Sequence, residues 1–187
     1  MKFTNTIQVL QQLGSSVVDK AKKNLKNKQT KSNKLYNSID YIVNSDKDGV
    51  KVTWEFGDKI YWNFVDQGVK GAGGYKGSGK MRGGNSPFRF GSGKGKGDWQ
   101  DFKTSIKKWI ANKPLRLRGA GGRFVEKNKQ NINSAAYLIQ RAIYQRGLTR
   151  TLFFTKPYDT QIANYENIIV QALADDLEIE LDTIIKD

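Results

Sequence analysis

The chemistry open to this chain is limited by two residue types that it lacks. The 187 residues include no His and no Cys. The chain is therefore without the commonest general base, the commonest metal ligand and the strongest nucleophile, and it has no thiols for disulfides or thiolate metal sites. We expect a protein that is not an enzyme and that uses no cofactor and no catalytic metal.

One segment has the spacing of a phosphate-binding loop. The stretch Gly74 to Lys80, G-Y-K-G-S-G-K, matches G-x-x-x-x-G-K, but Met81 follows where a Ser or Thr should hold magnesium. No hydrophobic strand precedes the stretch, and no helical pattern begins at Lys80. A tract rich in glycine produces such spacings by chance, so we assign no nucleotide site here.

Carboxylates gather near the end of the chain, at Asp175, Asp176, Glu178 and Glu180. A metal site or an acid–base pair would need other groups to converge on them. We expect these carboxylates to form the solvated or subunit-facing side of an amphipathic helix. A divalent-metal-dependent nuclease that uses Asp175 or Glu178 is the enzyme alternative.

The tract from Gly68 to Gly97 points more directly to a partner, because it is rich in glycine and cations and contains no acid. Glycine loses much backbone entropy on ordering and brings no side chain to bury, so we expect an inserted arm that is mobile or held by a partner. A second Gly/Arg loop covers 114–131. The cations expected to contact a subunit or DNA are Lys70, Lys76, Lys80, Arg82, Arg89, Lys94, Lys96, Arg116, Arg118 and Arg123.

These cations lie among aromatic residues, as in flexible segments that bind nucleic acid. A solvated loop, or a loop docked on an acidic neighbouring subunit, has the same composition. The net charge is +14 and is unevenly spread, since residues 68–130 hold sixteen Lys or Arg against three acids and residues 157–187 hold eight acids against one Lys. Such a division suits attraction between copies as well as attraction to nucleic acid, and it predicts that assembly weakens with salt.

The apolar pattern indicates one α+β domain over residues 1–187. We expect a small antiparallel sheet, a hairpin plus one or two strands, packed by a long N-terminal helix and by C-terminal helices. The hairpin strands are predicted at 35–44 and 50–56, after a helix over 4–27. The stretch 59–68 fits a helix or a strand equally, and its residues Tyr61, Trp62, Phe64 and Val65 are expected to form a packed anchor at the base of the arm.

Three helices are expected after the arm. The first is capped by Asp98 and closed by Pro114, and the second begins at Asn133 or Ser134 and ends at Gly147. The run 149–157 reads as extended, and Asp159 opens the last helix, which continues nearly to the end. The apolar residues predicted on one face of that helix are Ile162, Tyr165, Ile169, Leu173, Leu177, Leu181 and Ile184.

No segment reads as a signal peptide or a membrane span, so we expect a soluble protein of a cytoplasm or of a particle assembled there. In this order of elements the chain resembles the head–tail joining, neck and tail-completion proteins of tailed bacteriophages, the minor tail component family. The likeness is carried by K-L-Y-N-S-I at 34–39, Y-W-N-F-V-D-Q-G at 61–68, and the stretches 106–113, 136–147 and 152–157. The long basic arm departs from the family, whose members often have only a short loop there.

The resemblance implies a structural protein of the virion neck or tail that forms a ring between portal and tail. Its partners would be copies of itself, neighbouring portal, adaptor or tail proteins, and packaged DNA, with no membrane. The alternative is a non-virion nucleic-acid-binding module that uses the same basic arms.

Overall fold

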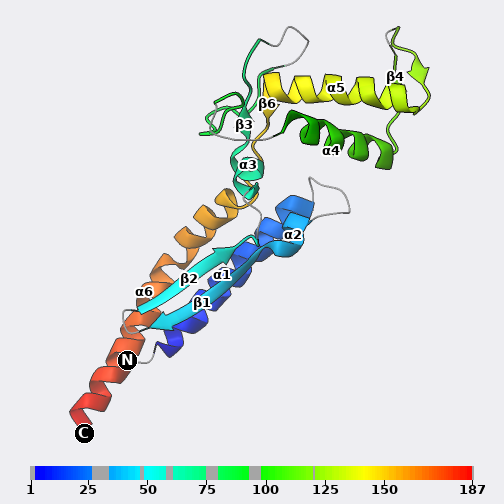
Figure 1. The fold of residues 1–187 in the computed structure, drawn as a ribbon. Helices are drawn as coiled ribbons and strands as arrows, with labels where there is room; N and C mark the ends of the chain where they lie inside the picture. The colour runs from blue at the N-terminus through cyan, green and yellow to red at the C-terminus, as the bar shows by residue number, and fades with distance from the viewer. Residues whose placement is uncertain are drawn as a thin grey trace. The chain divides into compact units, whose positions relative to one another are not determined.

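The computed structural model describes residues 3–26, 34–46, 49–57, 61–74, 80–92, 98–119 and 121–186. The fold class is α+β, as predicted, with small antiparallel sheets of two strands each. Contacts between residues group the chain into two compact units, whose helices and strands are labelled in Figure 1. Unit 1 comprises Met1–Asp66 and Thr151–Asp187, and unit 2 comprises Gln67–Arg150. Each unit is described by itself.

Unit 1 is built on the long helix α1 (Thr4–Lys26), which lies beside the hairpin of β1 (Asp40–Asp46) and β2 (Gly49–Glu55) and beside α6 (Thr155–Lys186) (Figure 1). The apolar residues of α1 recur every three or four positions, so they form one stripe that packs into the core. The buried members of that stripe are Leu10, Leu13, Val17, Val18, Ala21 and Leu25.

The hairpin confirms the clearest two-residue period of the sequence. Its strands pair antiparallel from Asp40 opposite Glu55 to Asp46 opposite Gly49. Tyr41 on β1 packs toward α1 at Gly14, where an added Cβ would lie 2.2 Å from the Tyr41 ring. A glycine in mid-helix weakens the helix, and here it gives the ring the room to lie close.

Two short helices flank the hairpin. The predicted first strand, 35–44, is wrong at its beginning, because Lys34–Ser38 forms helix α2 and β1 starts only at Asp40. Leu35 and Ile39 are both buried, and their four-residue spacing is that of a helical turn. The stretch that sequence could not assign contains helix α3 (Trp62–Gln67).

Helix α6 begins at Thr155, four residues before the predicted Asp159. The buried carboxylate of Asp66 accepts hydrogen bonds from the backbone N–H of Phe154 at 2.8 Å and of Thr155 at 3.3 Å, and from the Thr155 hydroxyl. Asp66 thus satisfies N–H groups that the first turn of a helix leaves without intrahelical partners. Pro157 lies in that first turn, where its missing N–H has no cost.

Unit 2 contains an antiparallel helix pair, α4 (Trp99–Asn112) and α5 (Lys129–Arg146), and two strand pairs (Figure 1). Strands β4 (Leu117–Arg118) and β5 (Phe124–Val125) form a hairpin between the helices, and β3 (Val69–Lys70) pairs with β6 (Gly147–Leu148). The core of this unit is small. Its buried members are Ile106, Ile110, Leu117 and Ala136.

The helix ends of unit 2 follow the predicted caps in part. Asp98 caps α4 by accepting from the Gln100 N–H, and Gly147 ends α5 with a positive φ, both as predicted. The predicted start of α5 at Asn133 or Ser134 is wrong, because Asn128 caps the helix by accepting from the Asn131 N–H. The added turn brings Ile132 into the core.

Candidate interaction surfaces

The described parts of the glycine tract, 68–74 and 80–92, lie against the C-terminal end of α5. Backbone N–H groups of Ala72, Gly73 and Arg82 donate to the carbonyls of Tyr144, Gln145 and Arg146 at 2.9, 3.1 and 2.7 Å. These are carbonyls of the last helical turn, which lack intrahelical donors. The described part of the tract therefore acts as a backbone cap on α5, a contact within the chain that the prediction of an arm, mobile or held by a partner, did not include.

Glycine is required at this contact because the two backbones approach very closely. A Cβ added at Gly71 would lie 2.0 Å from the Gln145 carbonyl oxygen, and one at Gly83 would lie 2.5 Å from the Lys70 nitrogen. At Gly147 the Val69 carbonyl oxygen would be 2.2 Å away. The described residues of the tract are thus placed by main-chain packing, which the composition did not predict.

The described part of the tract contains four of the predicted cations. Lys70, Lys80, Arg82 and Arg89 are exposed. The backbone of Lys70 pairs with Gly147 on one side and is hydrogen-bonded to Phe88 and Phe90 on the other. Lys76, Lys94 and Lys96 lie outside the described residues. The hydrogen-bonded backbone thus places the described charges of the tract at one end of α5.

A second group of predicted cations lies on the β4–β5 hairpin. The guanidinium carbon of Arg118 is 4.3 Å from the centroid of the Phe124 ring, and that of Arg116 is 5.4 Å away. Arg118 also donates to the Gly122 carbonyl at 2.8 Å, which fixes its position. Phe124 is 55% exposed, and Arg123 is exposed beside it. The hairpin therefore displays an exposed aromatic ring with two guanidinium groups close to it.

The two groups of cations are not one site. The tract caps the C-terminal end of α5, and the hairpin precedes its N-terminal end (Figure 1). A helix of 18 residues is about 27 Å long at about 1.5 Å per residue. The described residues among the ten predicted to contact a partner therefore form at least two separate surfaces.

The charge divides by unit. Unit 2, residues 67–150, holds 19 Lys or Arg and 3 Asp or Glu, a net +16, whereas unit 1 holds 13 and 15, a net −2. The whole excess of positive charge thus belongs to unit 2, and the acids of residues 157–187 belong to unit 1.

Helix α6 carries apolar residues on two opposite sides. Ala172 is buried against α1, and Tyr165 and Ile169 pack on the core of unit 1. The other side carries a second row at spacings of three and four, which we call the outer stripe. The outer stripe consists of Val170, Leu173, Leu177, Leu181 and Ile185, all exposed. The single apolar face predicted for this helix is therefore wrong: it mixes core-facing residues with residues of the outer stripe.

Among the carboxylates near the chain end, Asp176 has a structural role that the sequence did not reveal. Its two oxygens accept from the backbone N–H of Asn5 at 2.9 Å and of Thr6 at 2.8 Å, so it caps the first turn of α1. Burial would raise the pKa of Asp176, but these hydrogen bonds outweigh burial and lower that pKa below its ordinary value of 3.8. The predicted solvated or subunit-facing position is wrong for Asp176.

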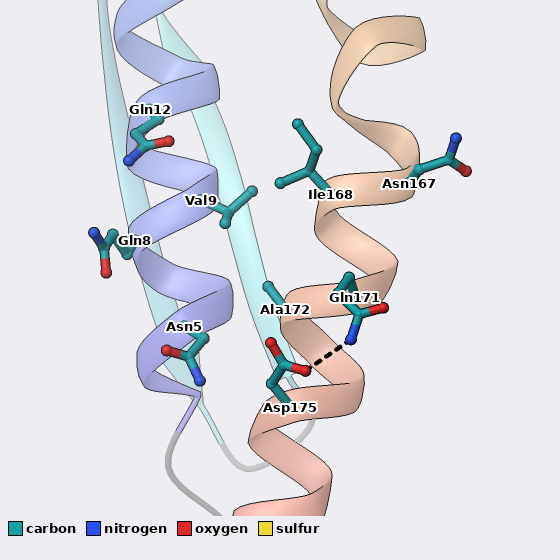
Figure 2. A pocket seen from close by; sticks show the side chains of 9 residues that line it. All are labelled: Asn5, Gln8, Val9, Gln12, Asn167, Ile168, Gln171, Ala172 and Asp175. Carbon is teal, nitrogen blue, oxygen red and sulfur yellow. Dashed lines mark hydrogen bonds between the residues drawn. The ribbon is translucent and has the colours of Figure 1, made fainter.

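A shallow groove of about 470 Å³ runs between α1 and α6 (Figure 2). The residues that line it are Asn5, Gln8, Val9, Gln12, Asn167, Ile168, Gln171, Ala172 and Asp175. Gln171 donates to Asp175 at 2.8 Å, the bond drawn in Figure 2. The side-chain amides that line the groove can both donate and accept hydrogen bonds, so they suit neutral polar groups. The described residues contain no cluster of acids suited to a metal ion, so Asp175 and Glu178 are not joined by further acidic ligands there.

Of the four residues expected to form a packed anchor at the base of the arm, two are packed and two are exposed. Trp62 stacks on Phe56 with ring centroids 4.0 Å apart, and Val65 packs on the core of unit 1. Phe64, on the short helix α3, is 39% exposed, and Tyr61, which precedes that helix, is 42% exposed.

Comparison of the chain with protein-family models, curated proteins and solved structures finds no match. Within the described residues, none of the helices has the length and apolar content needed to cross a bilayer.

Proposed function

We propose that this chain is a structural subunit that assembles with copies of itself, as a ring in the neck or tail connector of a tailed phage virion. The phage context rests on the resemblance of the short motifs described above. The observation that carries self-assembly is the division of charge, +16 on unit 2 against −2 on unit 1 with its acidic last helix.

Two further features support an assembly role. The described cations of the tract stand on a backbone hydrogen-bonded to α5, so little backbone entropy is lost when a neighbour binds them. The outer stripe leaves five large apolar residues of α6 exposed, and contiguous apolar surface of this kind is typical of protein interfaces. Portal, adaptor or tail proteins and packaged DNA are the other partners that this function includes.

The test is native mass measurement and electron microscopy of the purified chain across a salt series. We expect closed rings at low ionic strength that dissociate as salt screens the attraction between units. A chain that stays monomeric at every concentration and salt level, and that never enters a phage particle, overturns the proposal.

A second candidate function, binding of single-stranded nucleic acid outside a virion, is favoured by the Arg116–Phe124–Arg118 arrangement. An exposed ring with guanidinium groups close to it can stack a base while the cations meet phosphates. Fluorescence anisotropy with a labelled oligonucleotide tests it. Tight binding by the monomer that weakens about tenfold in Phe124→Leu, but not in Phe64→Leu, favours this function over the ring.

A further inference from the structure

The outer stripe of α6 is a row of five exposed apolar residues, and its surroundings are acidic. Val170 is 64% exposed, Leu181 58% and Ile185 80%. Figure 1 shows that the last turns of α6 extend past the first residues of α1, so part of the stripe stands on a projecting helix.

Helical geometry places acids on both flanks of this stripe. At 3.6 residues per turn, Glu178 lies to one side of Leu177 and Leu181, and Glu180 lies to the other. Residues 157–187 carry eight acids and one Lys, so the apolar row lies in a negative field.

Unit 2 has a surface of the opposite kind on α5. Tyr137 and Leu138 are 45% and 60% exposed and follow each other on the side of α5 away from its buried Ala136. The Lys103 ammonium nitrogen lies 5.9 Å from the centroid of the Tyr137 ring, and Arg141 follows Tyr137 by one helical turn and is exposed. This second surface is therefore apolar at its centre and basic at its edges.

We propose that the outer stripe of α6 docks onto the Tyr137–Leu138 surface of α5 in a second copy of this chain. Leucines of the stripe would pack on Tyr137 and Leu138, while Glu178 and Glu180 meet Lys103 and Arg141. This inference rests on the proposed function, because it names the contact through which the copies assemble.

Charge argues for this occupant over a second α6. Two α6 helices packed stripe to stripe would bring acids against acids, which costs several kcal/mol when such charges are forced together. Docking onto α5 pairs opposite charges instead. Because the two surfaces differ, the contact is heterologous, so successive copies add head to tail and close into a ring when the rotation per step allows.

Substitutions on α6 test the apolar part of the contact. The double variant Leu177→Gln, Leu181→Gln removes the centre of the stripe, and Gln preserves helix propensity. We expect it to raise the dissociation constant of self-association by roughly tenfold or more in sedimentation equilibrium. The matched control is Ile179→Gln. Ile179 is 59% exposed on another side of the same helix, and its substitution should change the constant by no more than about twofold.

Charge reversal tests the polar part and does not depend on the stripe. We expect Glu178→Lys with Glu180→Lys to weaken association, and Lys103→Glu with Arg141→Glu in the same chain to restore it. Zero-length cross-linking of mixed isotope-labelled and unlabelled protein should join Glu178 or Glu180 to Lys103 between chains of different label.

The outcomes separate this inference from the proposed function. A wild-type chain that is monomeric under all conditions overturns both. Rings that are unaffected by Leu177→Gln, Leu181→Gln, or cross-links found only within single chains, overturn the docking contact and leave the ring in place.

Discussion

Replacing Gly71 by Ala tests the close packing of the tract on α5. The new Cβ would lie 2.0 Å from the Gln145 carbonyl oxygen and 2.6 Å from the Arg146 carbonyl carbon. Both are main-chain atoms of a helix and cannot turn aside. Since real Cβ atoms essentially never approach a heavy atom closer than 3.0 Å, the two backbones must separate by about 1 Å.

That separation removes neighbouring hydrogen bonds. The Ala72 and Gly73 N–H groups donate to the Tyr144 and Gln145 carbonyls at 2.9 and 3.1 Å. Each contributes about 1 kcal/mol net, and a more restricted unfolded chain returns roughly 0.5 kcal/mol. We expect Gly71→Ala to destabilise this part of unit 2 by about 1.5–2 kcal/mol.

Hydrogen exchange followed by mass spectrometry measures this local loss of stability directly. The Ala72 and Gly73 amides should exchange roughly 10- to 30-fold faster, because about 1.4 kcal/mol corresponds to a factor of ten. Gly121→Ala is the matched control, since no atom lies within 4 Å of its added Cβ. If Gly71→Ala exchanges as slowly as the wild type, the tract does not cap α5 as described, and the explanation of its glycines is wrong.

Three further predictions concern unit 1. Asp176→Asn should lower the free energy of unfolding by about 1–2 kcal/mol at pH 7, measured by urea titration. Because the native pKa of Asp176 is lowered, the difference between variant and wild type should persist down to a pH near the ordinary pKa of 3.8. It should shrink as the pH falls further, which urea titrations at several pH values will show. Asp66→Ala leaves the Phe154 and Thr155 N–H groups without their acceptor and should lower the free energy of unfolding by about 2–4 kcal/mol in the same titration. Asp66→Asn should cost less, because its amide oxygen still accepts. Equal costs for the two variants would argue against the cap. Gly14→Ala should lower the free energy of unfolding by about 1–3 kcal/mol, since the added methyl would lie 2.2 Å from the Tyr41 ring. Adding Tyr41→Val should recover part of that loss. Additive effects of the two substitutions would show that the two sites are not in contact.

The elements that sequence predicted well are those whose pattern is local. Helix α1 and the hairpin repeat their apolar residues at fixed spacings, and Asp98 caps the helix that directly follows it. The start of α6 was missed because its cap, Asp66, lies 88 residues before Phe154 in the chain. A cap contributed by a distant segment leaves no local signal.

The buried and exposed faces of α6 were predicted wrongly from the sequence for a related reason. The side of α6 that faces α1 carries the buried polar residues Gln161 and Asp176, while leucines occupy the outer side, so hydrophobicity alone selects the wrong face. The predicted cations are exposed where the structure describes them, but composition could not tell that α5 holds them apart. Likewise, the order of the glycine tract depends on the carbonyls of α5, which are not adjacent to the tract in sequence.

The two ends of unit 2 leave unit 1 side by side. The Thr151 N–H donates to the Val65 and Asp66 carbonyls at 3.2 and 3.0 Å, and the Leu152 N–H donates to the Asp66 carbonyl at 2.9 Å. The intervening 84 residues therefore return to the point from which they depart. A segment inserted in this way can lengthen, shorten or be exchanged between relatives without displacing a strand or helix of its host, so the basic module and the scaffold are free to evolve at different rates.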